Sequence, residues 1–368
     1  MIYLTFNDNI SGIYKSQVVD VLFALNKIHN QEIKLVAFFS LRNYLSQKRQ
    51  LKRLYPNSIS LPMFPKLKNW QWNVFLLKFF TRDIEFICRG VFATNLAFML
   101  SANRVVYDGR GAITEEFKEY KVGGNFSEKQ VFKLEKKAVL SATFRIAVSS
   151  KLVEYWQKDF GYKADNHVII PCTVSTNEIQ KNKTINRKVL NFKEDDIVIV
   201  FTGGNGEWQS YDKMLTVLEN YLKSSSTIKV LLLCGSSDKI HFLQEKYHGR
   251  VVVKWVNFQD VQGYIDLADY GIVVRDQSVT NYVSSPVKIA EYLSCGLKIL
   301  ISPNIGDFSD FIIDENLGHL IDNKSLPKLN KSSQIDKNRI KSISFDFFNK
   351  KSNFIEKKFR YLLRKINT

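Results

Sequence analysis

Residues 275 to 301 read RDQSVTNYVSSPVKIAEYLSCGLKILI, a pattern that indicates a charged loop, a short helix and a buried strand. A charged loop leads to Ser285 and Pro286, a short helix follows, Gly296 ends it, and an apolar strand begins. Ser285 is typical of a helix N-cap, and Pro286 suits the first helical turn because its missing N–H costs nothing there. The free N–H groups and the dipole at such a helix start favour binding of a phosphate.

Two charged residues of this helix indicate the kind of ligand. Lys288 and Glu291 are three residues apart and therefore share one helix face. A cation beside phosphates and a carboxylate beside hydroxyls would together suit a nucleotide diphosphate. The competing interpretation is an ordinary buried βαβ turn in which the Lys–Glu pair only solvates the helix.

The pattern SPVKIAEYLSCGLKIL resembles the donor-site helix of GT-B glycosyltransferases, in particular the family 4 enzymes of bacterial capsule and O-antigen assembly. In that family a Glu at the place of Glu291 holds the ribose hydroxyls of the sugar nucleotide. The family motif has a second, earlier Glu, and Val283 stands at that place here. The resemblance implies that Arg275, Ser285, Lys288 and Glu291 bind a nucleotide-sugar donor.

The length of 368 residues and the alternation of strands with helices predict two α/β domains with parallel sheets. The resemblance implies the GT-B architecture, in which two Rossmann-like domains face each other and a C-terminal helix crosses back to the N-terminal domain. We expect an acceptor-binding domain over residues 1–172, a linker over 173–188, a donor domain over 189–345 and an amphipathic helix over 346–368.

Glycines after one strand of the second half are a further donor-site signal. Gly203 and Gly204 follow an apolar run over residues 197–202, so backbone N–H groups there could cradle a diphosphate. In many family members this loop also supplies a Lys–Gly pair that neutralises the diphosphate. Gln209 and Ser210 occupy that place here, so we expect Arg275 or Lys288 to carry the charge instead.

The run DGRGAITEE, which begins at Asp108, is the corresponding signal in the first half. Asp108 could act as a base or orient a sugar hydroxyl, and Arg110 could bind phosphate. With Arg275 and Lys288 they form our predicted catalytic set. The competing account pairs Asp108 with Arg110 in a turn. The predicted acceptor side of the cleft consists of Gly12 and Tyr14 from the loop over residues 7–14, Arg89 from a strand end, and Glu115.

The net charge of +17 implies an anionic partner, for which nucleic acid, an acidic membrane surface and a phosphorylated substrate are the candidates, and its distribution favours a membrane surface. Residues 42–78 carry eight Lys or Arg and no acid, interleaved with aromatic residues. Such a composition is typical of surfaces that contact anionic head groups, although a solvated helix and a core helix would also explain it. The C-terminal segment is read as a core-packing helix, with a basic membrane-lying helix as the alternative. No nucleic-acid-binding module accompanies the charge, so we expect no nucleic acid partner.

The sequence shows no apolar run long enough to span a bilayer and no signal-peptide pattern. We therefore expect a cytoplasmic protein associated peripherally with the inner face of the plasma membrane. The four cysteines are scattered, so neither a disulfide framework nor a zinc site is indicated.

The resemblance implies transfer of a sugar from a nucleotide-diphosphate sugar to a hydroxyl of a lipid-linked glycan, with retention of configuration and without a metal or other cofactor. The alternative is a non-catalytic scaffold that keeps the fold and binds sugar nucleotides or glycans. Val283 and Gln209 raise that alternative.

Overall fold

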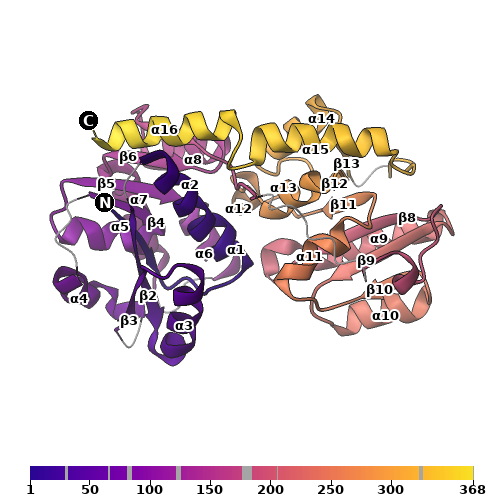
Figure 1. Cartoon of the computed structure of the whole chain (residues 1–368), viewed down its shortest axis with the longest axis horizontal. Coiled ribbons are helices and arrows are strands. Elements are labelled where there is room, and N and C mark those ends of the chain that lie inside the picture. The colour runs from indigo at the N-terminus through magenta and orange to yellow at the C-terminus, as the bar shows by residue number, and fades with distance from the viewer. Residues whose placement is uncertain are drawn as a thin grey trace. The chain divides into compact units, whose positions relative to one another are not determined.

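The computed structural model describes residues 1–29, 32–64, 67–80, 85–121, 126–175, 185–204, 206–322 and 326–367. The chain forms two compact units, each built on one parallel sheet (Figure 1). Unit 1 comprises Met1–Ser175, Val283–Ser285 and Lys350–Thr368, and unit 2 comprises Thr176–Tyr282 and Pro286–Asn349. The predicted α/β class with two parallel sheets is confirmed. Residues 176–184 of the expected linker lie outside the described residues.

Unit 1 holds a seven-stranded sheet, counted over the described residues, in the order β3-β2-β1-β4-β5-β6-β7. All neighbouring strands are parallel; for example, Leu4 pairs with Val36 on one side and Cys88 on the other. The strands are β1 (Ile2–Phe6), β2 (Lys34–Ser40), β3 (Ile59–Met63), β4 (Glu85–Arg89), β5 (Arg104–Gly109), β6 (Phe144–Ala147) and β7 (His167–Ile169).

Alternate side chains of these strands point to opposite faces and fill two apolar cores. Tyr3, Leu35 and Phe39 belong to one core, and Leu4 and Phe38 to the other. The helices of unit 1 are α1 (Gly12–Tyr14), α2 (Asp20–His29), α3 (Tyr44–Leu54), α4 (Asn73–Phe80), α5 (Gly90–Met99), α6 (Ile113–Tyr120), α7 (Glu128–Ser141), α8 (Ser150–Phe160) and α16 (Asn353–Asn367).

Unit 2 holds a six-stranded sheet, again within the described part of the chain, in the order β10-β9-β8-β11-β12-β13. Its strands are β8 (Ile197–Thr202), β9 (Ile228–Leu233), β10 (Val251–Val253), β11 (Tyr270–Val273), β12 (Lys298–Ile301) and β13 (Gly318–Leu320). Its helices are α9 (Tyr211–Ser224), α10 (Asp238–Lys246), α11 (Phe258–Ile265), α12 (Val279–Tyr282), α13 (Val287–Ser294), α14 (Phe308–Asp314) and α15 (Gln334–Phe348). The strand order reverses between β8 and β11, and such a switch point is where open α/β sheets bind ligands.

The predicted C-terminal helix over residues 346–368 is wrong in its start. Its apolar residues divide between two helices, because the chain becomes extended at Asn349 and Lys350 N–H donates to the carbonyl of Val174 at 3.2 Å. Within unit 1, α16 packs on α2 and β7. Its apolar side chains join the core, so the core-packing interpretation is confirmed and the membrane-lying alternative is wrong for Ile355, Phe359, Leu362, Leu363 and Ile366. No described helix is long and apolar enough to span a membrane.

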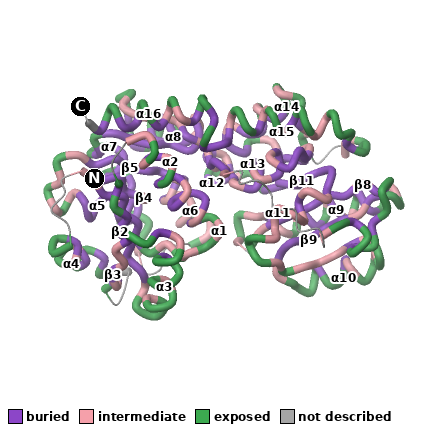
Figure 2. Tube along the Cα trace, in the orientation of Figure 1, coloured by how far each residue is buried: buried purple, intermediate pink, exposed green. Residues whose placement is uncertain are grey.

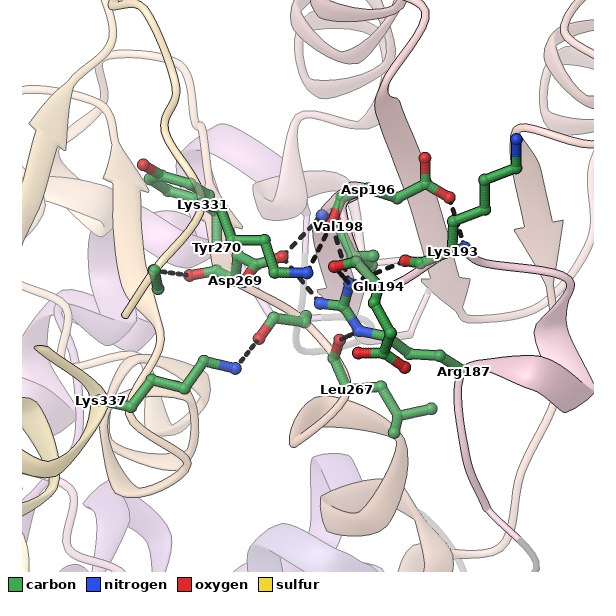
Figure 3. Close-up of polar contacts among 12 residues, drawn as sticks. Arg187, Lys193, Glu194, Asp196, Val198, Leu267, Asp269, Tyr270, Lys331 and Lys337 are labelled. Atoms are coloured by element: carbon green, nitrogen blue, oxygen red, sulfur yellow. Dashed lines mark hydrogen bonds and ion pairs between the residues drawn. The ribbon is translucent and has the colours of Figure 1, made fainter. Parts of the chain in front are cut away.

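A buried ion pair in unit 2 lies at the amino ends of β8 and β11 (Figure 3). Arg187 donates to Asp269 Oδ2 at 2.9 Å and also to the carbonyl oxygens of Leu267 and Asp196. The same carboxylate oxygen accepts the N–H of Val198 at 3.0 Å. Since Asp269 is fully buried, these contacts fix the segment that enters β8 onto the sheet.

Candidate functional site

The β8 end of the unit 2 sheet carries the glycine loop that the sequence predicts. Gly203 donates its N–H to the carbonyl of Leu233 at 3.2 Å and has a positive φ of 156°. A Cβ atom on Gly203 would lie 2.9 Å from Lys288 Nζ, whereas a Cβ on Gly204 would meet nothing within 4 Å. The loop backbone therefore approaches the lysine side chain directly at Gly203.

Helix α13 holds Lys288 over this loop. The buried Tyr292 on the same helix accepts the N–H of Thr202 at 2.8 Å, which ties α13 to the end of β8. Lys288 is only 9% exposed, donates to Gln209 Oε1 at 2.8 Å and lies 4.2 Å above the ring of Phe201. Burial, together with the nearby charge of Arg275, lowers the pKa of Lys288 well below its ordinary value, despite the opposing effect of Glu291.

Arg275 reaches the same amide from the end of β11. It is 6% exposed and donates to Gln209 Oε1 at 3.5 Å and to Asn281 Oδ1 at 3.1 Å. Gln209 thus joins two buried cations, Arg275 and Lys288, which we call the cation pair. Lys288 makes no ion pair with a described carboxylate. Two buried like charges on one neutral oxygen form a site that an anion would stabilise.

The sequence analysis missed the contribution of Gln209. Its position suggested the loss of a diphosphate-binding lysine, but its side chain positions both remaining cations. Asn281 was also missed, since a polar residue in a loop carries no signal of its partner. Glu291 is partly exposed on α13, one turn beyond Lys288. Its predicted contact with ribose stays a prediction.

The predicted N-cap at Ser285 is wrong. Pro286 precedes the first helical residue of α13, with an extended ψ of 117° and no side-chain capping bond. The Ser285 hydroxyl oxygen instead accepts the N–H of Cys172 at 2.9 Å within unit 1. The hydroxyl is therefore used by a tertiary contact, and the first N–H groups of α13 receive no bond from it. Val283, at the place of the earlier family Glu, is fully buried.

In unit 1, Asp108 forms the centre of a buried polar cluster at the end of β5. It is 1% exposed, and its oxygens lie 2.9 Å from Arg110 Nε and 3.9 Å from an Arg89 nitrogen. Tyr3 OH donates to Asp108 Oδ2 at 2.7 Å. The pairing of Asp108 with Arg110 is therefore confirmed, with Asp108 inside the strand. The catalytic roles of both residues stay predictions.

Two of the residues predicted for the acceptor side lie in a short helix and not in the predicted loop. Gly12 and Tyr14 form the one-turn helix α1, where we expected a loop, because the Ser11 side chain caps it and a π-helical turn continues it. Tyr14 is buried, with its OH 3.0 Å from Thr5 Oγ1. Glu115 pairs with Lys118 at 2.7 Å on α6.

A buried carboxyl group on α7, Glu135, was not predicted. Glu135 accepts the N–H groups of Ile113 and Thr114 at the start of α6, at 3.0 and 2.7 Å. Burial raises the pKa of Glu135 to about 7, although these bonds oppose the rise. The four cysteines are buried and free. Among the described residues, no three His, Cys, Asp or Glu side chains group as metal ligands.

No protein-family model matches the sequence, and no curated protein matches it. Solved structures match the fold over nearly the whole chain. Sucrose-phosphate synthase from Thermosynechococcus elongatus has a TM-score of 0.71 at 12% identity, covering 100% of this chain and 99% of that one. HepE from Anabaena, in complex with UDP-glucose, has a TM-score of 0.65 at 13% identity, covering 99% of each chain. A glycosyltransferase from Rickettsia africae has a TM-score of 0.61 at 11% identity, covering 100% and 98%.

The same fold also occurs in a protein named for a different reaction. UDP-N-acetylglucosamine 2-epimerase from Neisseria meningitidis, bound to its UDP-sugar, has a TM-score of 0.60 at 13% identity and full coverage of both chains. At these identities the likeness establishes the GT-B fold, and the reaction has to be argued from the site.

Proposed function

We propose that this protein is a glycosyltransferase that moves a sugar from a nucleotide-diphosphate sugar to a hydroxyl of a polyprenyl-diphosphate-linked glycan, in the synthesis of a cell-surface polysaccharide. The observation that carries the proposal is the cation pair at the switch point of the unit 2 sheet. Two buried cations, Arg275 and Lys288, lie at the end of a glycine loop and beside a helix start. A diphosphate would bring negative charge to these two cations.

The proposed chemistry is stabilisation of the departing diphosphate. As the bond between the sugar and the diphosphate breaks, negative charge grows on the phosphate oxygens, and fixed positive groups lower the energy of that state. Lys288, Arg275 and the first N–H groups of α13 would provide these groups. Glu291 would hold the ribose. These residues carry out the task without a metal, and we propose retention of configuration, as the family resemblance implies.

Asp108 and Arg110 are proposed to position the acceptor. Arg110 would contact the phosphate of the carrier or a sugar hydroxyl, while Asp108 holds the guanidinium through the 2.9 Å ion pair. Asp108 itself is nearly inaccessible, so its role is to orient Arg110 rather than to take up a proton. Gly12, Tyr14, Arg89 and Glu115 are proposed to line the acceptor side.

Product analysis separates transfer from the two alternatives. The full chain is incubated with UDP-, GDP- and CMP-linked sugars, with and without a lipid-linked glycan acceptor, and the products are identified by mass spectrometry and NMR. Glycan elongation with release of nucleotide is expected. Conversion of the donor into an epimer without acceptor would replace the proposal by epimerisation. Binding without any conversion would indicate a scaffold.

Substitution of Gly203 tests the close approach of the loop to the cation pair. Gly203→Ala places a methyl group 2.9 Å from Lys288 Nζ and should therefore displace the lysine and weaken donor binding, by about tenfold if one charged hydrogen bond is lost. Gly204→Ala is the matched control, because its Cβ meets nothing within 4 Å. Calorimetric titration of the nucleotide measures both. Equal affinities in the two variants would contradict the placement of the diphosphate at this loop.

A further inference from the structure

We infer that the β3 edge of the unit 1 sheet is a docking surface for an anionic lipid bilayer. This surface, called the edge surface, consists of α3, β3, the aromatic residues Phe64 and Trp72, and α4. The inference deepens the proposed function and rests on it only in giving a lipid-linked acceptor as the reason for docking.

The aromatic half of the edge surface exposes large rings to solvent. Phe64, Trp72, Phe75 and Phe79 are 44%, 56%, 57% and 86% exposed. The rings of Phe64 and Trp72 lie 6.4 Å apart and those of Trp72 and Phe75 6.0 Å apart, so the first three form a continuous row. Clusters of exposed apolar side chains are rare on soluble proteins and mark binding surfaces.

The structure holds this aromatic half in place. Asn73 is fully buried; its Oδ1 accepts the N–H of Phe64 at 2.8 Å, and its Nδ2 donates to the carbonyl of Trp70 at 2.8 Å. Trp70 and Leu77 are themselves buried in the core. The exposed rings are therefore carried by an anchored framework, and their exposure is not the result of a helix detached from the unit.

The basic half is helix α3. Its buried side chain is Leu51, which packs in the core, whereas its cations are exposed. None of these cations makes an ion pair with a described carboxylate, and Lys52 Nζ donates to the carbonyl of Pro56 at 2.6 Å, so their positive charge is not neutralised and can attract anionic head groups. They are Lys48, Arg49, Lys52 and Arg53, with Arg42 just before the helix.

Both halves are attached to the same edge strand. Tyr44 OH on α3 donates to the carbonyl of Ser60 in β3 at 3.0 Å, and Asn73 on α4 bonds to Phe64, the residue after β3. α3 and α4 flank β3 at one end of unit 1 (Figure 1), and α3 is largely exposed (Figure 2). Pro62 within β3 removes one backbone donor from the edge, which opposes pairing with another strand.

The combination of aromatic and basic side chains on the edge surface favours an anionic bilayer over a second copy of this chain. Aromatic side chains favour the interfacial region of a membrane, and the cations of α3, which lies on the other face of the sheet from α4, favour its anionic head groups. A second copy of this chain would bring the unpaired cations of two α3 helices toward one another, which like-charge repulsion disfavours. The sequence predicted a basic surface over residues 42–78. The edge surface includes only the described cations of that range, because Lys66 and the side chain of Lys68 lie outside the described residues.

Vesicle binding tests the inference with the full chain. Sedimentation with phosphatidylcholine vesicles, with and without phosphatidylglycerol, is measured for the wild type, for Phe75→Ser/Phe79→Ser and for Arg49→Gln/Lys52→Gln/Arg53→Gln. We expect binding to the anionic vesicles, about tenfold weaker for the aromatic variant and about a hundredfold weaker for the basic variant. Brominated lipids should quench Trp72, and Trp72→Phe should lose that quenching.

The matched controls remove an exposed aromatic ring and three exposed lysine charges at positions outside the edge surface. Phe242→Ser replaces a ring that is 62% exposed in unit 2, and Lys129→Gln/Lys133→Gln/Lys136→Gln removes three exposed charges from α7. Both controls should bind vesicles like the wild type. Losses equal to those of the edge variants would overturn the inference, as would unchanged binding of the edge variants or a concentration-dependent dimer that the aromatic variant abolishes. Binding measures no turnover, so a chain that docks but transfers no sugar contradicts the proposed function alone.

Discussion

Lys288→Met is expected to abolish most of the sugar transfer while leaving the fold at least as stable as the wild type. Removal of one fixed positive group from a site of developing negative charge lowers turnover by about 10²–10³-fold. The same substitution also removes a buried charge that lies beside Arg275, and relief of burial and repulsion should raise the free energy of unfolding. Steady-state kinetics and urea unfolding measure the two effects.

The opposite changes in activity and stability distinguish a ligand-binding lysine from a structural one. Lys239→Met, which removes an exposed partner of Asp212 in the same unit, is the control and should change neither quantity greatly. Loss of stability together with activity in Lys288→Met would mean that the lysine holds the fold, and the cation pair would lose its proposed role.

The pH dependence of nucleotide binding follows from the lowered pKa of Lys288. Above that lowered pKa and below the ordinary value of 10.5, the unfolded chain binds more protons at this site than the folded chain, so stability rises with pH. A bound diphosphate raises the pKa again, and binding then takes up a proton. Affinity should therefore fall as pH rises through this range, and Lys288→Met should lose the part of the slope due to this lysine.

Arg187→Ala is expected to destabilise unit 2 by about 3–5 kcal/mol, because it leaves the carboxylate of Asp269 buried without its cation. Asp269 is fully buried, and the guanidinium also satisfies backbone carbonyl oxygens at the amino end of β8 (Figure 3). Urea unfolding, followed by tryptophan fluorescence and circular dichroism, measures the loss.

A double substitution is the sharper control for the Arg187 prediction. Arg187→Met/Asp269→Leu removes both charges and should recover part of the stability that Arg187→Ala loses. Arg360→Ala, which breaks an exposed pair with Glu356 on α16, should have little effect. A loss as small for Arg187→Ala as for Arg360→Ala would show that the buried pair contributes little to unit 2.

The fold was largely predictable because both sheets are parallel and buried on both faces. Their strands are continuous apolar runs such as IVIVF at residues 197–201, and these runs stand out against the amphipathic helices between them. The C-terminal segment was less predictable, since an apolar helical pattern continues through Asn349. The break there depends on the bond from Lys350 to Val174, and no local pattern encodes that tertiary contact.

The candidate site was predictable in its charged residues and not in its neutral ones. Arg275 and Lys288 stand at positions that motif spacing marks, and the structure brings them together. Gln209 was missed because sequence position shows where a lysine is absent but not how far an amide side chain reaches. Ser285 was assigned to a cap because its local context fits one, whereas the N–H of Cys172, distant in the chain, uses its oxygen.

Calorimetric titration of UDP, GDP, CDP, ADP and dTDP into the wild type and Lys288→Met tests most directly whether the cation pair holds a nucleotide diphosphate. We expect at least one nucleotide to bind the wild type with proton uptake, seen as heats that differ between buffers, and to bind Lys288→Met about tenfold more weakly or worse. Equal affinity for both chains, or no binding of any of the five nucleotides to the wild type, would contradict a donor site at Arg275 and Lys288.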